Sequence, residues 1–535
     1  MSKNNNSSPI ILHAMDFDNL KELARFLNKN LSKEIQFINT NKNKKNKTEQ
    51  FLQILLDNKI LNEKEAVRRL FKSYDTRYPA YLKIKNKVIQ QLNLLIFLVD
   101  FNQSIDRDRV KAYYSTKKDY TAAMILYTRD CTRLAVLMLE EVLEKAMKYD
   151  FVDLVVDTSK ILRNEFKRAS SNLDKCQYYT QIYRKYEKIK NYESIASEYF
   201  ETLIEIYIVK RSPSNEISLK ASNYFNKLYP FVTVVGTSTF YFYTYSILLI
   251  KLLSLNKISE ALNECNTIID FLEKKKNTNL SMILGFMLQK MACLTHLKIN
   301  DNDEIDKLHS YFRKHNENSA FNWVRFNEVY FYYCCYTMQY YKALKIYNEI
   351  FVDCQLFSIE GIYHDNWLLL GGYLHLLAQL NQLDPQEVES VAGKFRYSKL
   401  FNEIEVLKKD KEGMNIPLIL LPVLYELTQS AGKPAKEIPV EALEKYRQRW
   451  LANDLNSRSN SFFRIVMTLA QYPHLTVNHK KKINREFASI KSQTPEIARQ
   501  YFAIEVIPYE TLTELLLEKM GLSSILDQPQ PLAAN

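Results

Sequence analysis

The residues suited to metal or acid–base chemistry are scattered along the chain. Its 535 residues include eight histidines and seven cysteines. Neither an H-E-x-x-H motif nor a C-x2-C pair occurs, although such spacings are what place zinc ligands close together. Most of the cysteines lie inside apolar helical patterns, which is typical of buried thiols in a reducing compartment. We therefore expect no metal site.

The tripeptide Tyr363-His364-Asp365 could imitate a general base. An imidazole beside a carboxylate can move protons near neutral pH, but an exposed turn before the next helix explains these residues more simply. The chain has no glycine-rich phosphate loop, no G-x-S-x-G motif and no kinase-like signature, the usual marks of phosphate binding and nucleophilic catalysis. We predict a protein that is not an enzyme and has no cofactor. We keep an enzyme with an unrecognised site as an alternative hypothesis.

Two basic clusters near the C-terminal end could contact a polyanion, and the net charge of +12 admits such a partner. Arginine beside an aromatic ring can stack on bases or pair with phosphate. The candidate residues are Arg447, Arg449, Trp450, Lys480, Lys481 and Lys482. We favour the alternative interpretation, in which these residues are cations at helix ends and in a solvated loop.

Residues 228–250 contain no charged side chain and are long enough to span a bilayer. Pro230, Gly236 and several Thr, Ser and Tyr residues lower the mean hydropathy of this segment, so a loop followed by a buried helix is the better interpretation. The apolar run near the N-terminus is too short for a signal peptide. We expect a cytoplasmic protein without a membrane span.

The elements that position these residues are predicted to be helices. The chain has nine glycines, none of them before Gly236, whereas strand-rich folds use glycine at tight turns with positive φ. Apolar stripes at helical spacing predict helices at 18–31, 48–56 and 63–71, and a longer one ending near residue 100. Pro422 is expected to kink or end its helix, and Thr494-Pro495 is typical of a helix start.

A recurring pattern begins near residue 106 and indicates repeated helix pairs. Each copy has an apolar or aromatic residue after a polar turn, a small or apolar residue three positions later, and another apolar residue four positions beyond. Ala261 and Ala343 are the small residues of two clear copies, which begin at Ile258 and Tyr340. A small side chain at this position allows two helices to cross closely.

One stretch carries a family signature. Trp367, Leu370, Gly371 and Leu374 follow the spacing W-x2-L-G-x2-Y, with leucine in the last position. This stretch resembles the start of a tetratricopeptide helix pair. The copies between residues 106 and 400 recur at roughly 30 to 70 residues, against a regular period of about 34, so the array is a diverged one. A generic stack of helical hairpins outside that family is the alternative.

The resemblance implies an all-α fold, an α-solenoid of antiparallel helix pairs whose inner helices form a concave surface for a peptide or another protein. The first helix of each pair would supply the inner face. The candidate groove residues are Tyr183, Tyr186, Tyr245 and Asn327. Tyrosine offers a large contact area at low entropic cost, but many such rings can equally be filler between helices.

The predicted organisation has three parts. Residues 1–105 form an N-terminal helical region with a basic loop, residues 106–400 form the tetratricopeptide-like array, and residues 401–535 form a C-terminal helical cap with a disordered tail. We predict an intracellular scaffold that binds a protein or peptide. The alternative is a regulatory protein that binds nucleic acid through its basic N- or C-terminal regions. Salt titration separates the two, because nucleic-acid affinity falls steeply with salt.

Overall fold

The computed structural model describes residues 16–31, 46–57, 62–71, 78–99, 108–168, 172–206, 214–275, 278–316, 320–353, 361–429, 439–452, 456–471, 474–493 and 504–526. Most of the predicted basic loop, the predicted helix start at Thr494 and the C-terminal tail lie outside these residues. The described residues form helices and no β-strand, with one isolated antiparallel bridge between Leu31 and Val99. The prediction of an all-α fold is confirmed.

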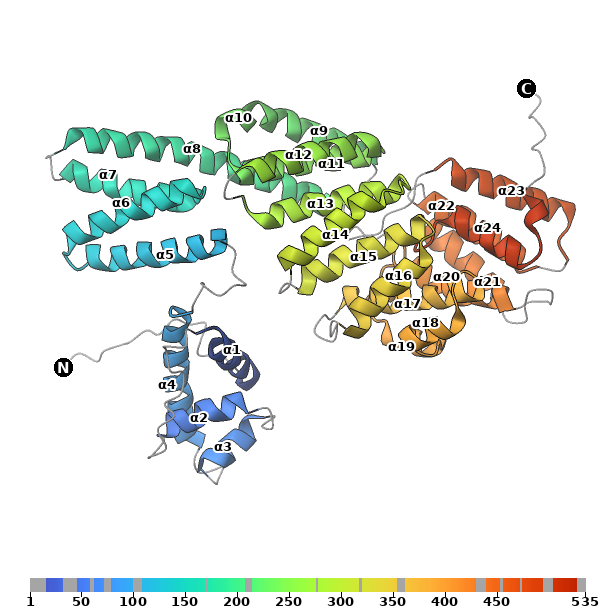
Figure 1. Ribbon diagram of the computed structural model, residues 1–535, viewed down its shortest axis with the longest axis horizontal. Helices are drawn as coiled ribbons and strands as arrows, with labels where there is room; N and C mark the ends of the chain where they lie inside the picture. Colours follow the sequence, from blue (N-terminus) through green and yellow to red (C-terminus); the bar gives the residue numbers. More distant parts are fainter. Residues whose placement is uncertain are drawn as a thin grey trace. The chain divides into compact units, whose positions relative to one another are not determined.

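The chain divides into two compact units, Met1–Ile182 and Tyr183–Asn535. The helices of the first unit, drawn in blue and cyan in Figure 1, are α1 (Phe17–Asn30), α2 (Lys47–Leu56), α3 (Glu63–Phe71), α4 (Tyr78–Ile96), α5 (Asp108–Tyr127), α6 (Thr132–Lys148), α7 (Val152–Arg168) and the start of α8 (Leu173–Ile204).

Local signals in the sequence begin the first helices. Asp16 caps α1 by accepting the backbone N–H of Asn19, and Asn46 and Glu49 form a reciprocal capping box at α2. Their apolar faces meet those of α3 and α4 in a hydrophobic core whose residues lie between Phe17 and Val99. The helices predicted from residue 18 to about residue 100 are therefore present, and they form a small bundle with its own core.

The second unit begins within α8. Its further helices are α9 (Ser214–Leu228), α10 (Val232–Val235), α11 (Ser238–Ser254), α12 (Ile258–Lys274), α13 (Leu280–His296), α14 (Asn302–Asn316), α15 (Ala320–Tyr336), α16 (Tyr340–Tyr347), α17 (Ile362–Gln379), α18 (Pro385–Ala392), α19 (Tyr397–Glu403), α20 (Asn415–Gln429), α21 (Val440–Tyr446), α22 (Ser457–Leu469), α23 (Val477–Lys491) and α24 (Tyr509–Lys519). Two π-helical segments, η3 (Asn348–Asp353) and η6 (Arg447–Leu451), extend α16 and α21.

One hydrophobic core runs through this unit from Tyr241 to Ile525. The helices beyond residue 400 therefore pack on those before it. Helix α20 continues through Pro422, so of the two effects expected from this proline, a kink or an end, the helix end does not occur. Buried neighbours such as Leu421 and Val423 hold the helix in the core on both sides of the proline. In the uncharged segment 228–250, short helical turns precede α11. No helix in the described part of the chain is long and apolar enough to cross a membrane.

The same turn closes four successive hairpins of the second unit, α11–α12, α13–α14, α15–α16 and α17–α18 (Figure 1). In each turn one residue has a positive φ, and the next backbone N–H donates to a carbonyl five residues earlier, as in a Schellman motif. The left-handed residues are Asn256, Lys298, Met338 and Asn381, at intervals of 42, 40 and 43 residues. The turns after α5 and α6 in the first unit, at Asp130 and Asp150, have the same geometry.

Candidate functional site

Two of the predicted groove residues lie on α8. Tyr183 and Tyr186 are both half-buried there. The Tyr183 hydroxyl donates to the Glu187 carboxylate one turn further along the helix, and the Lys185 ammonium lies 5.7 Å from the centre of the Tyr186 ring. Both rings retain accessible surface, so they remain candidates for contact with a ligand.

The other two predicted groove residues belong to helix packing. Tyr245 on α11 stacks on Tyr241, with ring centres 4.2 Å apart. Asn327 on α15 is fully buried, and its amide donates to the Trp323 carbonyl at 2.9 Å. The Asn327 side chain therefore does not reach a surface groove. Its amide is instead bonded to a carbonyl one turn earlier in the same helix.

The predicted polyanion residues fall on two elements, η6 and α23, that both pack against α22. Arg447 is engaged by Glu444, at 2.8 Å from its Nε, and by Asn460 at 2.7 Å. The hydrogen bond from Arg447 lowers the pKa of Glu444 to about 2. The exposed guanidinium of Arg449 lies 5.0 Å from the centre of the Trp450 ring.

The lysines of the second cluster lie within the first half of α23, not in the solvated loop of our favoured interpretation. Thr476 and His479 form a reciprocal capping box that begins this helix. Lys481 and Lys482 are exposed and Lys480 is half-buried. None of the three forms an ion pair with the described part of the chain.

The residues of the repeat signature are buried on α17. Trp367, Leu370 and Leu374 have no exposed surface. A β-carbon on Gly371 would lie 2.9 Å from Cζ of Tyr347 and closer still to the hydroxyl of that ring. Gly371 therefore makes room for an aromatic side chain from α16.

The small residues of the other two repeat copies occupy close helix contacts. Ala261 on α12 and Ala343 on α16 are fully buried. Helix α12 packs between α11 and α13, and α16 packs between α15 and α17. The positions predicted for close helix crossing are therefore in the core.

Asp365 does not belong to an exposed turn, contrary to our interpretation of the tripeptide that contains it. It is buried within α17. Its Oδ2 accepts backbone N–H groups from Glu405 at 2.9 Å, Val406 at 2.6 Å and Leu407 at 3.4 Å. With its oxygen occupied in this way, the carboxylate anchors the segment before α20 and is not arranged as a partner for His364.

A face of α6 that the sequence did not single out carries two exposed leucines. Leu134 and Leu137 are 52% and 54% exposed. Residues three apart share a helix face, and Glu141 and Glu144 continue that face by one and two turns and are exposed. The core side of the helix is formed by Ala135, Leu139, Val142, Leu143 and Ala146. The sequence signal for this face is apolar residues outside that core stripe.

Polar contacts flank the α6 face on both sides. On one side, Glu140 accepts hydrogen bonds from Lys175 at 2.8 Å and from Tyr179 at 2.6 Å, both on α8. Burial would raise the pKa of Glu140, but these hydrogen bonds and the lysine charge hold it below its ordinary value. On the other side, Lys145 pairs with Asp119 of α5 at 3.0 Å. These contacts hold α5 and α8 at the edges of the exposed row.

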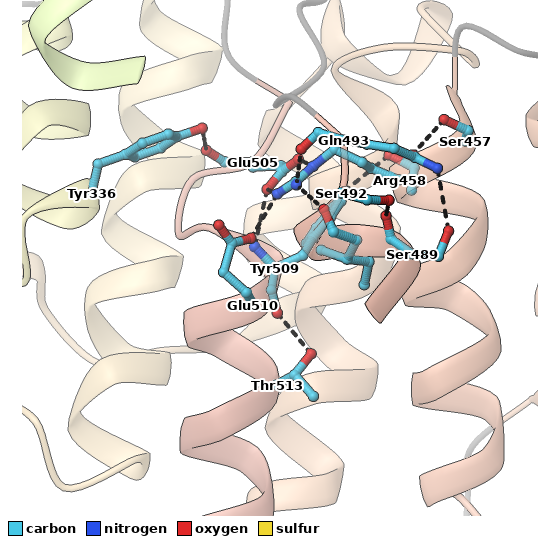
Figure 2. Close-up of polar contacts among 12 residues, drawn as sticks. Tyr336, Ser457, Arg458, Ser489, Ser492, Gln493, Glu505, Tyr509, Glu510 and Thr513 are labelled. Atoms are coloured by element: carbon cyan, nitrogen blue, oxygen red, sulfur yellow. Dashed lines mark hydrogen bonds and ion pairs between the residues drawn. The ribbon is translucent and has the colours of Figure 1, made fainter. Parts of the chain in front are cut away.

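The strongest buried charge cluster surrounds Arg458 on α22 (Figure 2). Its Nε and Nη2 donate to the two oxygens of Glu505 at 2.6 and 2.8 Å, and Nη2 also donates to Glu510 at 2.7 Å. Its Nη1 donates to the carbonyls of Ile490 and Gln493 at the end of α23. Burial alone would lower the pKa of Arg458, but the two carboxylates raise it.

Further hydrogen bonds connect this cluster to neighbouring helices. Tyr336 donates to the carbonyl of Glu505 at 3.2 Å, and the Tyr509 backbone N–H donates to the Glu505 carboxylate at 2.9 Å (Figure 2). The arrangement therefore ties α15, α22, α23 and α24 together. The described residues also contain no group of three or more His, Cys, Asp or Glu side chains that could hold a metal ion.

Comparisons with protein-family models, with curated proteins and with solved structures find no match to this chain.

Proposed function

We propose that the protein is a binding scaffold in which stacked helical hairpins present an extended surface to a peptide or to another protein. The observation that supports this proposal is the shared turn of the hairpins from α11 to α18, repeated at intervals of 42, 40 and 43 residues. Repeated hairpins that contact mainly their neighbours create an elongated surface. These intervals exceed the tetratricopeptide period of about 34 residues, which favours a diverged or generic hairpin stack.

The exposed surface that we consider for partner binding lies in the first unit. We assign the binding surface to the α6 face formed by Leu134, Leu137, Glu141 and Glu144. Leucines that are half exposed on a rigid helix offer apolar area at little entropic cost. Tyr183 and Tyr186 on α8 stay as predicted ligand contacts of the second unit.

Affinity purification from the native host, with quantitative mass spectrometry, tests the scaffold proposal. The full-length tagged protein should enrich a specific partner over a tag-only control. Leu134→Ser with Leu137→Ser should lose that partner, whereas Leu219→Ser, at a 65% exposed leucine of α9, should retain it. Failure of the wild-type protein to enrich any partner would contradict the proposal.

The exposed lysines of α23 favour a second candidate function, binding of nucleic acid. In that case the affinity for a single-stranded oligonucleotide would fall steeply with salt because lysines that neutralise phosphates release counterions. Lys481→Ala with Lys482→Ala would reduce the salt slope by about 1.4, or about 0.7 for each lysine that contacts a phosphate of a single strand. A flat salt response removes this candidate.

A further inference from the structure

The two leucines exposed on α6 are not an extension of the core. An α-helix turns by about 100° per residue, so Leu134 and Leu137 lie on the side of α6 away from Ala135, Leu139 and Val142. Both side chains are about half exposed, at 52% and 54%. Burying the exposed half of such a side chain against a partner is favourable.

The carboxylate groups next to these leucines are also available to a partner. Glu141 and Glu144 are exposed and form no ion pair with the described part of the chain. The neighbouring charges, by contrast, are engaged: Glu140 with Lys175, and Lys145 with Asp119. In a chain with a net charge of +12, this helix therefore offers a local acidic spot adjoining an apolar one.

The order of charged and apolar side chains along the exposed face of α6 restricts which segments can bind to it. Arg133 is exposed at the start of the row, the leucine pair follows, and the glutamate pair completes it. The leucines and glutamates are about two helical turns, or 10 Å, apart. A matching segment needs apolar side chains and, at about that distance, cationic ones, because complementary charge fixes register and rejects acidic competitors.

We propose that the α6 face binds an amphipathic segment of another protein in which apolar residues are followed, about two helical turns along, by Lys or Arg. The segment packs its apolar side chains on Leu134 and Leu137, and its cations pair with Glu141 and Glu144. The contacts of Glu140 and Lys145 hold the row rigid from both sides. This inference rests on the scaffold function proposed above and adds the chemistry of the partner.

Fluorescence anisotropy with two synthetic peptides tests the inference on the full-length protein. The probe is a labelled peptide with a leucine pair and a lysine pair about two helical turns apart, and its counterpart has glutamates in place of the lysines. We expect the lysine peptide to bind about tenfold or more tightly than the glutamate peptide, because like charges facing each other are repulsive. Glu141→Lys with Glu144→Lys should reverse this preference.

Matched variants test whether Leu134 and Leu137 contribute specifically to peptide binding. Leu134→Ser with Leu137→Ser should weaken binding of the lysine peptide about tenfold or more. Leu219→Ser and Glu518→Lys, at exposed positions of α9 and α24, should leave it unchanged. Circular dichroism should show the same helical content in all variants, since every substituted side chain is exposed.

Three outcomes would overturn the inference. The first is equal binding of the two peptides, and the second is binding that the α6 variants do not change. The third is a dimer in sedimentation velocity that the Leu134 and Leu137 variant dissociates, which would assign the face to a second copy of this chain. If affinity purification still enriches a partner, the first two results reject only the partner chemistry. If nothing is enriched, the scaffold function fails as well.

Discussion

At the scale of single residues, Gly371 shows how the signature of α17 acts. Alanine at this position would bring its β-carbon into the Tyr347 ring, whose Cζ would lie only 2.9 Å away. Both residues are buried, so the clash requires a shift in the core. We expect Gly371→Ala to lower the free energy of unfolding by about 1–3 kcal/mol, the usual cost of overpacking.

Urea unfolding monitored by circular dichroism measures this effect. The combination with Tyr347→Phe removes the hydroxyl that comes closest and should recover part of the loss. An unchanged urea midpoint in Gly371→Ala would show that Tyr347 is free to move aside.

His296 at the end of α13 predicts a dependence of stability on pH. Burial, with the positive charge of Arg458, lowers its pKa to about 4. The unfolded chain, with an ordinary histidine pKa of about 6.5, therefore takes up this proton first as the pH falls. The stability that the folded protein gains from keeping His296 neutral is fully present above pH 6.5. It is lost as the pH falls from about 6.5 to 4. Because the imidazole keeps some exposure, the loss is on the order of 2 kcal/mol.

Urea midpoints of wild type and His296→Gln between pH 7 and pH 4.5 test this prediction. Burial also lowers the pKa of His309 and of His375. Protonation of these histidines therefore also destabilises the folded wild-type protein as the pH falls, and their effects add to that of His296. The difference between the two proteins isolates His296. Parallel profiles would contradict the assignment.

The residues of the polar clusters could not have been predicted from the sequence. Arg458 meets Glu505 and Glu510 across separations of 47 and 52 residues, and no local spacing signals such a pairing. The burial of Asn327 was likewise not apparent from its own residue type. In contrast, Trp367, Leu370 and Leu374 were found because three residues on one helix face report burial locally.

At the scale of elements, helix ends were predictable where a side chain marks them. Asp384 stands before Pro385, the arrangement that marks a helix start, and it caps α18 by accepting the N–H groups of Gln386 and Glu387. The left-handed conformation of two of the repeated turns was not predictable, because lysine and methionine occupy these positions at Lys298 and Met338. Such residues carry no preference for that conformation. The turn is imposed by packing of the two helices it joins.

This reasoning predicts a stabilising substitution. Met338 has a φ of 59° and is 66% exposed, so its side chain contributes strain and little packing. We expect Met338→Gly to raise the free energy of unfolding by about 1 kcal/mol, since glycine adopts this conformation without a steric penalty. The β-branched substitution Met338→Val should lower it.

Asn381→Gly is the matched control, because asparagine already tolerates the left-handed region and its gain should be smaller. Urea midpoints of the three variants provide the measurement. A lower midpoint for Met338→Gly than for the wild type would mean that the methionine side chain supports the hairpin.

At the scale of the whole molecule, the separation of cores is informative. The bundle α1–α4 is held by one hydrophobic core and the helices from α11 onward by another. The region beyond residue 400 was expected to cap the array, and its helices share the second core with those before them. Hydrophobic contacts of this kind do not by themselves fix the register of one helix against another, because many apolar faces can pack together. Register at the C-terminal end is better explained by the buried charges.

Arg458 is the residue on which that register depends most. Replacing it by methionine removes the cation from the fully buried Glu505, removes one of the two cations at the partly buried Glu510, and takes one donor from each of the carbonyls of Ile490 and Gln493. Breaking a buried ion pair from one side costs about 3–5 kcal/mol. Arg458→Met should therefore lower the free energy of unfolding by that amount and increase amide hydrogen exchange around Tyr509.

Two further variants distinguish a buried charge from a surface one. Arg485 pairs with Glu486 but is 71% exposed, and Arg464 pairs with the same carboxylate, so Arg485→Met should cost less than about 1 kcal/mol. Adding Glu505→Gln to Arg458→Met should restore part of the stability, since a neutral amide is less costly to bury than an unpaired carboxylate. If Arg458→Met and Arg485→Met are equally stable, hydrophobic packing alone fixes the C-terminal helices and the charge cluster does not determine their register.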